Sequence, residues 1–201
     1  MKKILTFLVL PLLIIGLGYA TWSSIQEPVN FNKEKDARSE VGIQRLKDIR
    51  TLQVAFKGKH GRFTSSIDSL IDYYNNGQIT IVKQIGSLDD SLAVAQKKVR
   101  RDSIRINVKD TLLKRANFNI NDLKVIPYSN GKPVLMTAVI KMVSGVEVPL
   151  FEAAMPFSDL LTDMNHQLIV NLRAERKDMN KYDGLKVGGI EAPNNNAGNW
   201  E

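Results

Sequence analysis

Apolar residues run without a charge from Ile4 to Trp22, and polar patterning begins only after this run. A helix rises about 1.5 Å per residue, so the run spans roughly 28 Å, close to the hydrocarbon thickness of a bilayer. Lys2 and Lys3 precede the run, and positive residues favour the cytoplasmic side of a membrane. The pattern therefore predicts one membrane helix with a cytoplasmic N-terminus and an exported remainder.

Two outcomes for residues 1–22 stay open. A cleavable signal peptide would use Gly18-Tyr19-Ala20 as its small-x-small cleavage site. An uncleaved membrane anchor is favoured by the length of the run and by Trp22, which stands at an interfacial position. The residues predicted to form the anchor are Ile4, Leu5, Phe7, Leu8, Leu10, Leu12, Leu13, Ile14, Ile15, Leu17 and Trp22.

The residues after the apolar run divide into a short stalk and one domain. Residues 23–32 contain Pro28 and show little periodicity, which is typical of a stalk. Residues 33–201 are long enough for one hydrophobic core and are predicted to form a single extracytoplasmic domain. A helix is predicted over residues 33–57, because apolar residues recur there every three or four positions. This apolar stripe consists of Ile43, Leu46, Ile49, Leu52 and Phe56.

Shorter elements are predicted in the middle of the chain. The cap sequence Thr64-Ser65-Ser66 indicates a helix that ends at Asn75-Asn76-Gly77. Strands are predicted over residues 78–85 and 104–108, the second from an apolar–polar alternation of period two. The stretch between them, 87–101, is predicted to be helical because its apolar residues share one face.

Three apolar runs, 123–128, 134–143 and 146–151, follow one another with turn signals between them. Asn130-Gly131 separates the first two runs and is a strong hairpin signal, because both central positions of such a turn need a positive φ. Ser144-Gly145 separates the second and third runs. The three runs therefore predict an antiparallel β-meander.

The segment after Pro156 predicts a C-terminal helix that begins at Ser158, with apolar residues on one face as far as Leu172. The tail from Tyr182 onward is rich in Gly and Asn, and we expect Trp200 to pack back onto the domain, since its apolar area would otherwise stay wet. Together these elements predict an α+β fold. An N-terminal transmembrane helix continues into an amphipathic helix, which packs on an antiparallel β-meander with a C-terminal helix.

The composition excludes several kinds of chemistry. The chain has no cysteine, which excludes disulfides, thiolate metal sites, thiol catalysis and an acylated lipoprotein. The net charge of +7 suits either nucleic acid or an acidic surface as a partner. Because export is predicted, anionic lipid headgroups and acidic partner proteins are favoured over nucleic acid.

Much of the positive charge lies between Lys97 and Arg115, a stretch with eight Lys or Arg residues and two Asp residues. Such a stretch forms either a solvated face between core positions or an interaction surface for acidic protein or lipid. Aromatic residues are nearly absent from it, which argues against base stacking with nucleic acid. The predicted interaction face consists of Lys97, Lys98, Arg100, Arg101 and Arg105.

No arrangement of residues in the sequence predicts catalysis or metal binding. His60 lies in a helix-ending loop, where a cap-and-turn role is expected. His166 is predicted to lie mid-helix beside Asp163, without a third metal ligand at a suitable spacing. No serine occupies a nucleophile elbow, and no phosphate-binding glycine loop joins a strand to a helix. We therefore expect neither an enzyme nor a cofactor.

The amphipathic helix ends in Ala55-Phe56-Lys57-Gly58-Lys59-His60-Gly61-Arg62-Phe63, after a membrane helix and before a predicted meander. This order of parts resembles that of type IV pilins and type II secretion pseudopilins, whose helix ends in a similar pattern. The likeness covers residues 1–75 by motif and the remainder by coarse architecture. The glycine cleavage site and the glutamate of pilins are absent from residues 3–6 and 4–22, so the resemblance implies the architecture without prepilin processing.

These observations predict a membrane-anchored, non-enzymatic structural or assembly component of the bacterial cell envelope, with a pilin-like plan. The alternative is a tethered periplasmic domain that binds or senses a ligand. The expected location is the inner membrane, crossed once, with a cytoplasmic N-terminus and an extracytoplasmic domain. The expected partners are the membrane and other envelope proteins or further copies of the chain, and nucleic acid is not expected.

Overall fold

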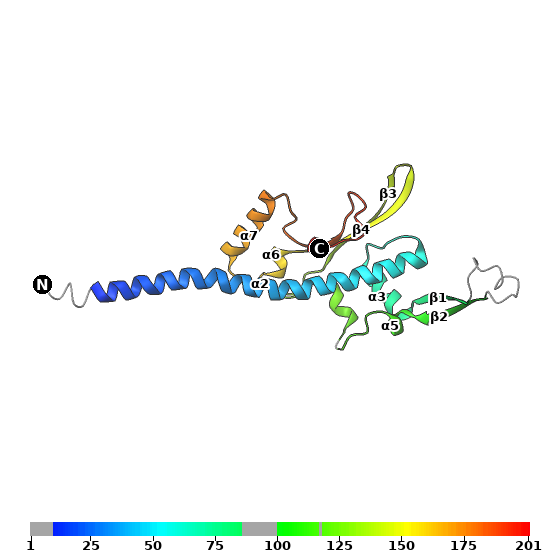
Figure 1. The fold of residues 1–201 in the computed structure, drawn as a ribbon, viewed down its shortest axis with the longest axis horizontal. Coiled ribbons are helices and arrows are strands. Elements are labelled where there is room, and N and C mark those ends of the chain that lie inside the picture. Colours follow the sequence, from blue (N-terminus) through cyan, green and yellow to red (C-terminus); the bar gives the residue numbers. More distant parts are fainter. Residues whose placement is uncertain (1–9, 86–99, 117) are drawn as a thin grey trace.

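The fold is α+β and is organised around one long helix, as Figure 1 shows. The structure, a computed structural model, describes residues 10–85, 100–116 and 118–201. Within these residues the strands form two antiparallel sheets, one of two strands and one of three. The long helix projects from the domain toward the N-terminus, while the sheets and shorter helices gather around its other half (Figure 1).

Helix α2 (Leu10–His60) has 51 residues and continues without a break through 23–32. The prediction that the helix begins at residue 33, after a stalk, is wrong. Pro28 lies inside the helix, where it removes one backbone hydrogen bond without ending it. The predicted end is confirmed: Gly61 adopts a φ of 72°, and its N–H donates to the Lys57 carbonyl at 2.8 Å.

The three-stranded sheet lies against the second half of α2. It consists of β3 (Leu135–Val143), β4 (Val146–Pro156) and β5 (Gly184–Gly188), in the order β3-β4-β5. Ser144 and Gly145 both have a positive φ and join β3 to β4, which confirms the predicted hairpin. Strand β5 was not predicted, because its five residues are glycine-bounded and pair with β4 across a long stretch of chain.

A second unit follows the end of α2. Ser66 caps α3 (Ile67–Asn76) through its hydroxyl, and this predicted helix is confirmed. The predicted strands are also confirmed as β1 (Gln78–Ile85) and β2 (Arg100–Asn107), which pair antiparallel. The short helix α5 (Val108–Thr111) follows β2.

The middle of the chain departs from two predictions. The helix predicted over 87–101 lies outside the described residues up to 99, and Arg100 and Arg101 belong to strand β2. The meander is not confirmed, because the first run, 123–128, begins in the 3₁₀ helix η2 (Ile120–Lys124) and continues as backbone that forms no strand. The Asn130-Gly131 turn has the predicted positive φ at both positions, although only one isolated bridge flanks it.

The single C-terminal helix predicted from Ser158 is also wrong. The segment forms α6 (Phe157–Leu160) and, after a turn, α7 (His166–Asp178). Asn165 separates them, because its side-chain oxygen accepts hydrogen bonds from the N–H groups of Gln167 and Leu168 and starts a new helix.

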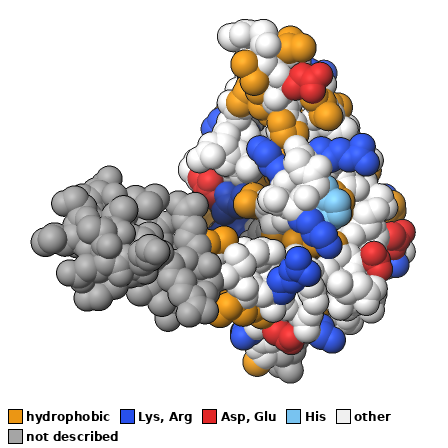
Figure 2. Space-filling model, turned by 90° about the vertical axis from the view of Figure 1, so that its right-hand side faces the viewer, with side chains coloured by type: hydrophobic (Ala, Val, Ile, Leu, Met, Phe, Trp, Pro, Cys, Tyr) orange, Lys and Arg blue, Asp and Glu red, His pale blue; other side chains and the backbone are white. Residues whose placement is uncertain are grey.

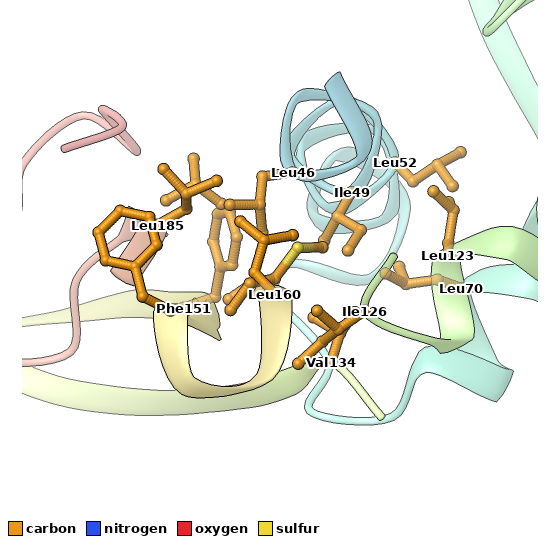
Figure 3. Close-up of a cluster of buried hydrophobic side chains, with 14 of the residues drawn as sticks. Leu46, Ile49, Leu52, Leu70, Leu123, Ile126, Val134, Phe151, Leu160 and Leu185 are labelled. Carbon is orange, nitrogen blue, oxygen red and sulfur yellow. The ribbon is translucent and has the colours of Figure 1, made fainter. Parts of the chain in front are cut away.

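The hydrophobic core lies between the second half of α2 and the elements around it (Figure 3). Leu46, Ile49 and Leu52 of α2 are fully buried, as the predicted apolar stripe requires. Gly42 lets the helix approach β5 closely, since a Cβ at this position would lie 2.8 Å from Leu185 Cδ1. The partners of the stripe drawn in Figure 3 include Leu70, Leu123, Ile126, Val134, Phe151, Leu160 and Leu185.

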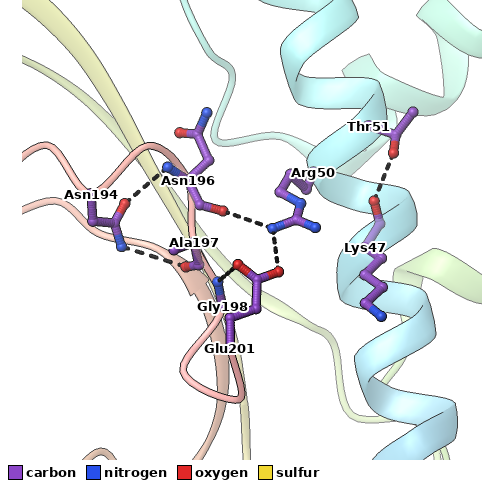
Figure 4. A network of polar contacts seen from close by, with 8 residues as sticks. All are labelled: Lys47, Arg50, Thr51, Asn194, Asn196, Ala197, Gly198 and Glu201. Carbon is purple, nitrogen blue, oxygen red and sulfur yellow. Dashed lines mark hydrogen bonds and ion pairs between the residues drawn. The ribbon is translucent and has the colours of Figure 1, made fainter.

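The tail after β5 folds back onto α2. Trp200 packs against the core cluster, as predicted. Arg50 of α2 donates hydrogen bonds to the Glu201 carboxylate at 2.8 Å and to the Asn196 carbonyl at 3.3 Å (Figure 4). The contact with Arg50 lowers the pKa of Glu201. These bonds hold a segment with little secondary structure in one place on the helix.

Candidate interaction surfaces

The first half of α2 presents an apolar surface that the described residues leave uncovered. Its large side chains are more than half exposed, and Leu12 and Ile15 reach 70% and 72%. A Cβ added at Gly16 or Gly18 would meet no atom within 4 Å. The described members of the predicted anchor, all exposed, are Leu10, Leu12, Leu13, Ile14, Ile15, Leu17 and Trp22.

The predicted anchor also includes Ile4, Leu5, Phe7 and Leu8, which lie outside the described residues. Among the helices of residues 10–85, 100–116 and 118–201, none combines the length and the apolar character that a bilayer crossing requires.

The two halves of α2 meet where the domain first contacts the helix. Phe31 is the first buried residue of α2 along the described chain. Just before it, the side-chain amide of Asn165 donates to the Glu27 carboxylate at 2.6 Å. Arg38 binds Asp163 through both terminal guanidinium nitrogens, donates to Glu34 at 2.8 Å and lies over the ring of Tyr128. The Arg38 hydrogen bond lowers the pKa of Asp163.

The predicted basic face is described only in part. Lys97 and Lys98 lie outside the described residues, and the side chains of Arg100 and Arg101 are not described. Arg105 is exposed on β2. Arg115, a further member of the basic stretch, forms an ion pair with the buried carboxylate of Asp48 on α2. The basic stretch therefore contains a residue that pairs within the protein as well as residues exposed to solvent.

Arg105 lines a groove of about 640 Å³ between the end of α2 and the ribbon of β1 and β2. The side chain of Tyr73 is buried there and donates its hydroxyl to the Ala55 carbonyl at 3.1 Å. Burial raises the pKa of Tyr73. Lys59 lies with its Nζ 5.6 Å from the centre of the Tyr73 ring. The residues lining the groove are Ala55, Gly58, Lys59, Tyr73, Gln78, Ile79, Thr80 and Arg105.

A second cavity, of about 530 Å³, lies between α2 and the segment before η2. Asp48 is its buried polar centre, with the Gln44 amide donating to one carboxylate oxygen at 3.1 Å and Arg115 binding the other. Val41 and Phe118 supply apolar walls. Arg45 also lines the cavity, and its guanidinium donates to the backbone carbonyls of Asp122 and Val125.

Neither histidine belongs to a metal site in the described part of the chain, where no three potential ligands gather. His60 ends α2 as expected: its ring stacks on Phe56, and Nδ1 lies 3.1 Å from the Phe56 carbonyl oxygen. The prediction that His166 lies mid-helix beside Asp163 is wrong. His166 is the first residue of α7, and Asp163, in the preceding turn, pairs with Arg38.

Sequence reasoning singled out Arg105 and did not identify the residues that share its groove. Lys59 and Tyr73 lie 46 and 32 positions before Arg105, and only the folding of β2 beside the end of α2 brings them together. Within the segment 55–63, on which the expected resemblance to pilins rests, Ala55, Gly58 and Lys59 line the groove. Comparison with protein-family models, curated proteins and solved structures finds no match to this chain.

Proposed function

We propose that this chain is a membrane-anchored structural or assembly component of the bacterial cell envelope, built on a plan that resembles pilins and pseudopilins. One observation carries the proposal: a single helix, α2, has an uncovered apolar half and a half that forms the core of a domain. In this role the protein acts through its surfaces and not through catalysis.

The physical argument concerns the solvent that each half of the helix requires. A helix that is apolar on all sides is stable when lipid or other protein surrounds it. Between Leu10 and Leu17 every residue is apolar or glycine, and all the large side chains are exposed. A continuous apolar surface of this kind is rare on soluble monomers and is typical of membrane or protein contacts. We assign it, together with residues 4–9, to the inner membrane.

The direction of insertion follows from the flanking residues. Lys2 and Lys3 favour a cytoplasmic N-terminus, and Trp22 is placed for the opposite interface. The helix crosses the bilayer once, and the domain from Phe31 onward lies outside the cytoplasm. Its partners are the membrane and envelope proteins, including further copies of the chain.

The chain's lack of cysteine makes a direct test practical, because every introduced thiol is unique. Leu13→Cys and Ile15→Cys place thiols on the uncovered half, and Glu175→Cys on exposed α7 is the control. We expect the full-length variants in the membrane fraction, where copper phenanthroline with oxygen, an oxidant that enters the bilayer, should join the thiols at positions 13 and 15 into disulfide-linked copies of the chain. Position 175 should give less product. A soluble chain whose mature N-terminus lies near Thr21 would contradict the proposal.

A second candidate function, a tethered ligand-binding domain, is favoured by the cavity at Asp48. Its volume of about 530 Å³ lies in the range of small-molecule sites, and it combines apolar walls with a few fixed polar groups. A small-molecule screen by thermal shift separates the two functions. A ligand whose stabilising effect is abolished in Asp48→Asn and kept in Glu175→Gln would favour the binding domain.

A further inference from the structure

The end of α2 farthest from the N-terminus carries a concentration of positive charge. Lys57 and Lys59 lie in the last turn of the helix, and Arg62 follows it. Figure 2 shows this end of the molecule, where Lys and Arg side chains gather around a histidine side chain. Cations at a helix C-terminus stabilise the helix through its dipole, and that accounts for part of the pattern.

The helix dipole does not explain the charge of the groove lined by Lys59 and Arg105. Its described lining contains these two cations and no carboxylate. Among the side chains that the structure describes, neither cation forms an ion pair, whereas Lys124 nearby pairs with Asp68 of α3. Lys59 and Tyr73 also line a neighbouring hollow that contains Asp68 and Asp72, and there Asp68 pairs with Lys124 while Asp72 accepts a hydrogen bond from Asn76. The groove therefore offers positive charge to an external ligand.

The free edge of a strand runs along the same groove. Strands β1 and β2 form a two-stranded sheet, so within residues 10–85, 100–116 and 118–201 the outer edge of β1 has no strand beside it. Val108 N–H donates to the Gly77 carbonyl at 3.0 Å, and these residues are opposite each other in the register. Because backbone groups alternate in an antiparallel ladder, the N–H and C=O groups of Gln78 and Thr80 point away from β2. Both residues line the groove.

The position of the groove excludes the anchoring bilayer as its ligand, and this step alone relies on the proposed function. A helix rises about 1.5 Å per residue, so His60 lies roughly 57 Å along α2 from Trp22. Surface charges act over about one Debye length, close to 8 Å at physiological salt. Lys59 and Arg105 therefore lie beyond the reach of the headgroups around Trp22.

We propose that this groove docks an extended acidic segment of a partner protein. The segment adds to the free edge of β1 through backbone hydrogen bonds, as in strand addition to exposed sheet edges. Its carboxylates pair with Lys59 and Arg105, and the buried ring of Tyr73 forms the floor. With a volume of about 640 Å³, the groove is large enough for several side chains of such a segment.

Fluorescein-labelled hexaglutamate is the probe, and fluorescence anisotropy with the full chain in detergent micelles is the measurement. We expect saturable binding that weakens about tenfold in Lys59→Glu/Arg105→Glu, because each reversal replaces attraction by repulsion. The matched control, Lys177→Glu/Lys181→Glu, makes the same change in net charge near α7 and should leave the affinity within about twofold. Circular dichroism verifies that both variants fold.

Two further arms separate strand addition from other modes of binding. Hexaglutamate with alternate backbone nitrogens methylated should bind more weakly to the unmodified chain, since it cannot donate to the β1 edge. Equal affinity for the methylated peptide, or equal loss in both double variants, would overturn the proposal. So would absent peptide binding together with Lys59- and Arg105-dependent capture of phosphatidylglycerol vesicles, which would assign the groove to an opposing lipid surface. Neither the micelle assay nor its result depends on membrane insertion or assembly.

Discussion

The two halves of α2 share one backbone and differ in what surrounds their apolar side chains. From Phe31 onward, the large apolar residues lie mainly in one stripe that is buried against the sheet and the short helices, while Val41 and Val54 are exposed. Between Leu10 and Leu17, apolar residues occupy all sides of the helix and remain exposed. Both halves are helical. They differ in how many faces of the helix are apolar and therefore need to be shielded from water.

This difference separates the folding of the domain from the placement of the protein. One-sided burial gives the domain its core, and substitutions there should act on stability. The surface that is apolar on all sides contributes nothing to the core, so substitutions there should change the location of the protein and not its stability. Each of the following substitutions tests whether the two halves can be altered independently.

The largest effect should come from a charge placed in the buried stripe. Ile49→Asp puts a carboxylate at a fully buried position and should destabilise the domain by about 4 kcal/mol or more, enough to unfold it. Ile14→Asp, in the uncovered half, should leave the unfolding transition unchanged and should reduce membrane association. Circular dichroism melts and protease resistance in detergent provide the measurement. Wild-type protease resistance of Ile49→Asp would remove the core assignment.

Glycine positions give a matched pair of smaller effect. Gly42 lies against Leu185, so Gly42→Leu should overpack the contact between α2 and β5 and cost about 1–3 kcal/mol. Gly18→Leu introduces the same side chain where no atom lies within 4 Å, and it should leave domain stability unchanged. Chemical denaturation of both variants tests the comparison, which fails if the two lose the same stability.

The ion pair at the junction gives a pH-dependent effect. Arg38 lowers the pKa of Asp163, so the pair stabilises the fold above the unfolded aspartate pKa of about 3.9, and the stabilisation is lost as pH falls through the lower folded pKa. Asp163 is largely exposed, and screening limits the effect to about 1 kcal/mol. Asp163→Asn should destabilise the domain at pH 7 and flatten its stability profile below pH 4. If the variant loses stability below pH 4 as the wild type does, the ion pair contributes nothing to stability.

The smallest effect is expected at Pro28, where the two halves join. Pro28→Ala restores a backbone donor to the helix, so amide exchange around residues 24–28 should slow. Domain stability should change by less than about 0.5 kcal/mol, because the core begins beyond this point. Hydrogen exchange followed by mass spectrometry measures both quantities. A large loss of domain stability would mean that Pro28 positions the domain on the helix.

Local signals were sufficient where the structure is decided by a few neighbouring residues. The cap at Ser66, the hairpin at Ser144-Gly145 and the stop at Gly61 were all predicted, because each depends on the chemistry of a single turn. The run at 123–128 was misassigned to a strand because it is apolar. Leu123 and Ile126, both buried, are three positions apart, a spacing that places side chains on one face of a helical turn but on opposite faces of a strand. Asn165 was overlooked as a cap inside an apolar pattern.

Contacts between distant segments could not be predicted from one sequence. Arg115 pairs with Asp48 across 67 positions, and Arg38 with Asp163 across 125. Neither pairing has a local signature, since charged residues of this kind also occur on solvated faces. The groove is of the same type: Arg105 was a candidate by its charge, while Lys59 joined it only through the fold.

The most direct test of the central claim measures what surrounds each half of α2. Spin labels at Leu12→Cys, Ile15→Cys and, in the domain half, exposed Lys47→Cys report collisions with oxygen and with a water-soluble nickel chelate in lipid vesicles. The account predicts frequent oxygen collisions and few nickel collisions at positions 12 and 15, and frequent nickel collisions with fewer oxygen collisions at position 47. Nickel collisions at positions 12 and 15 as frequent as at 47 would contradict it.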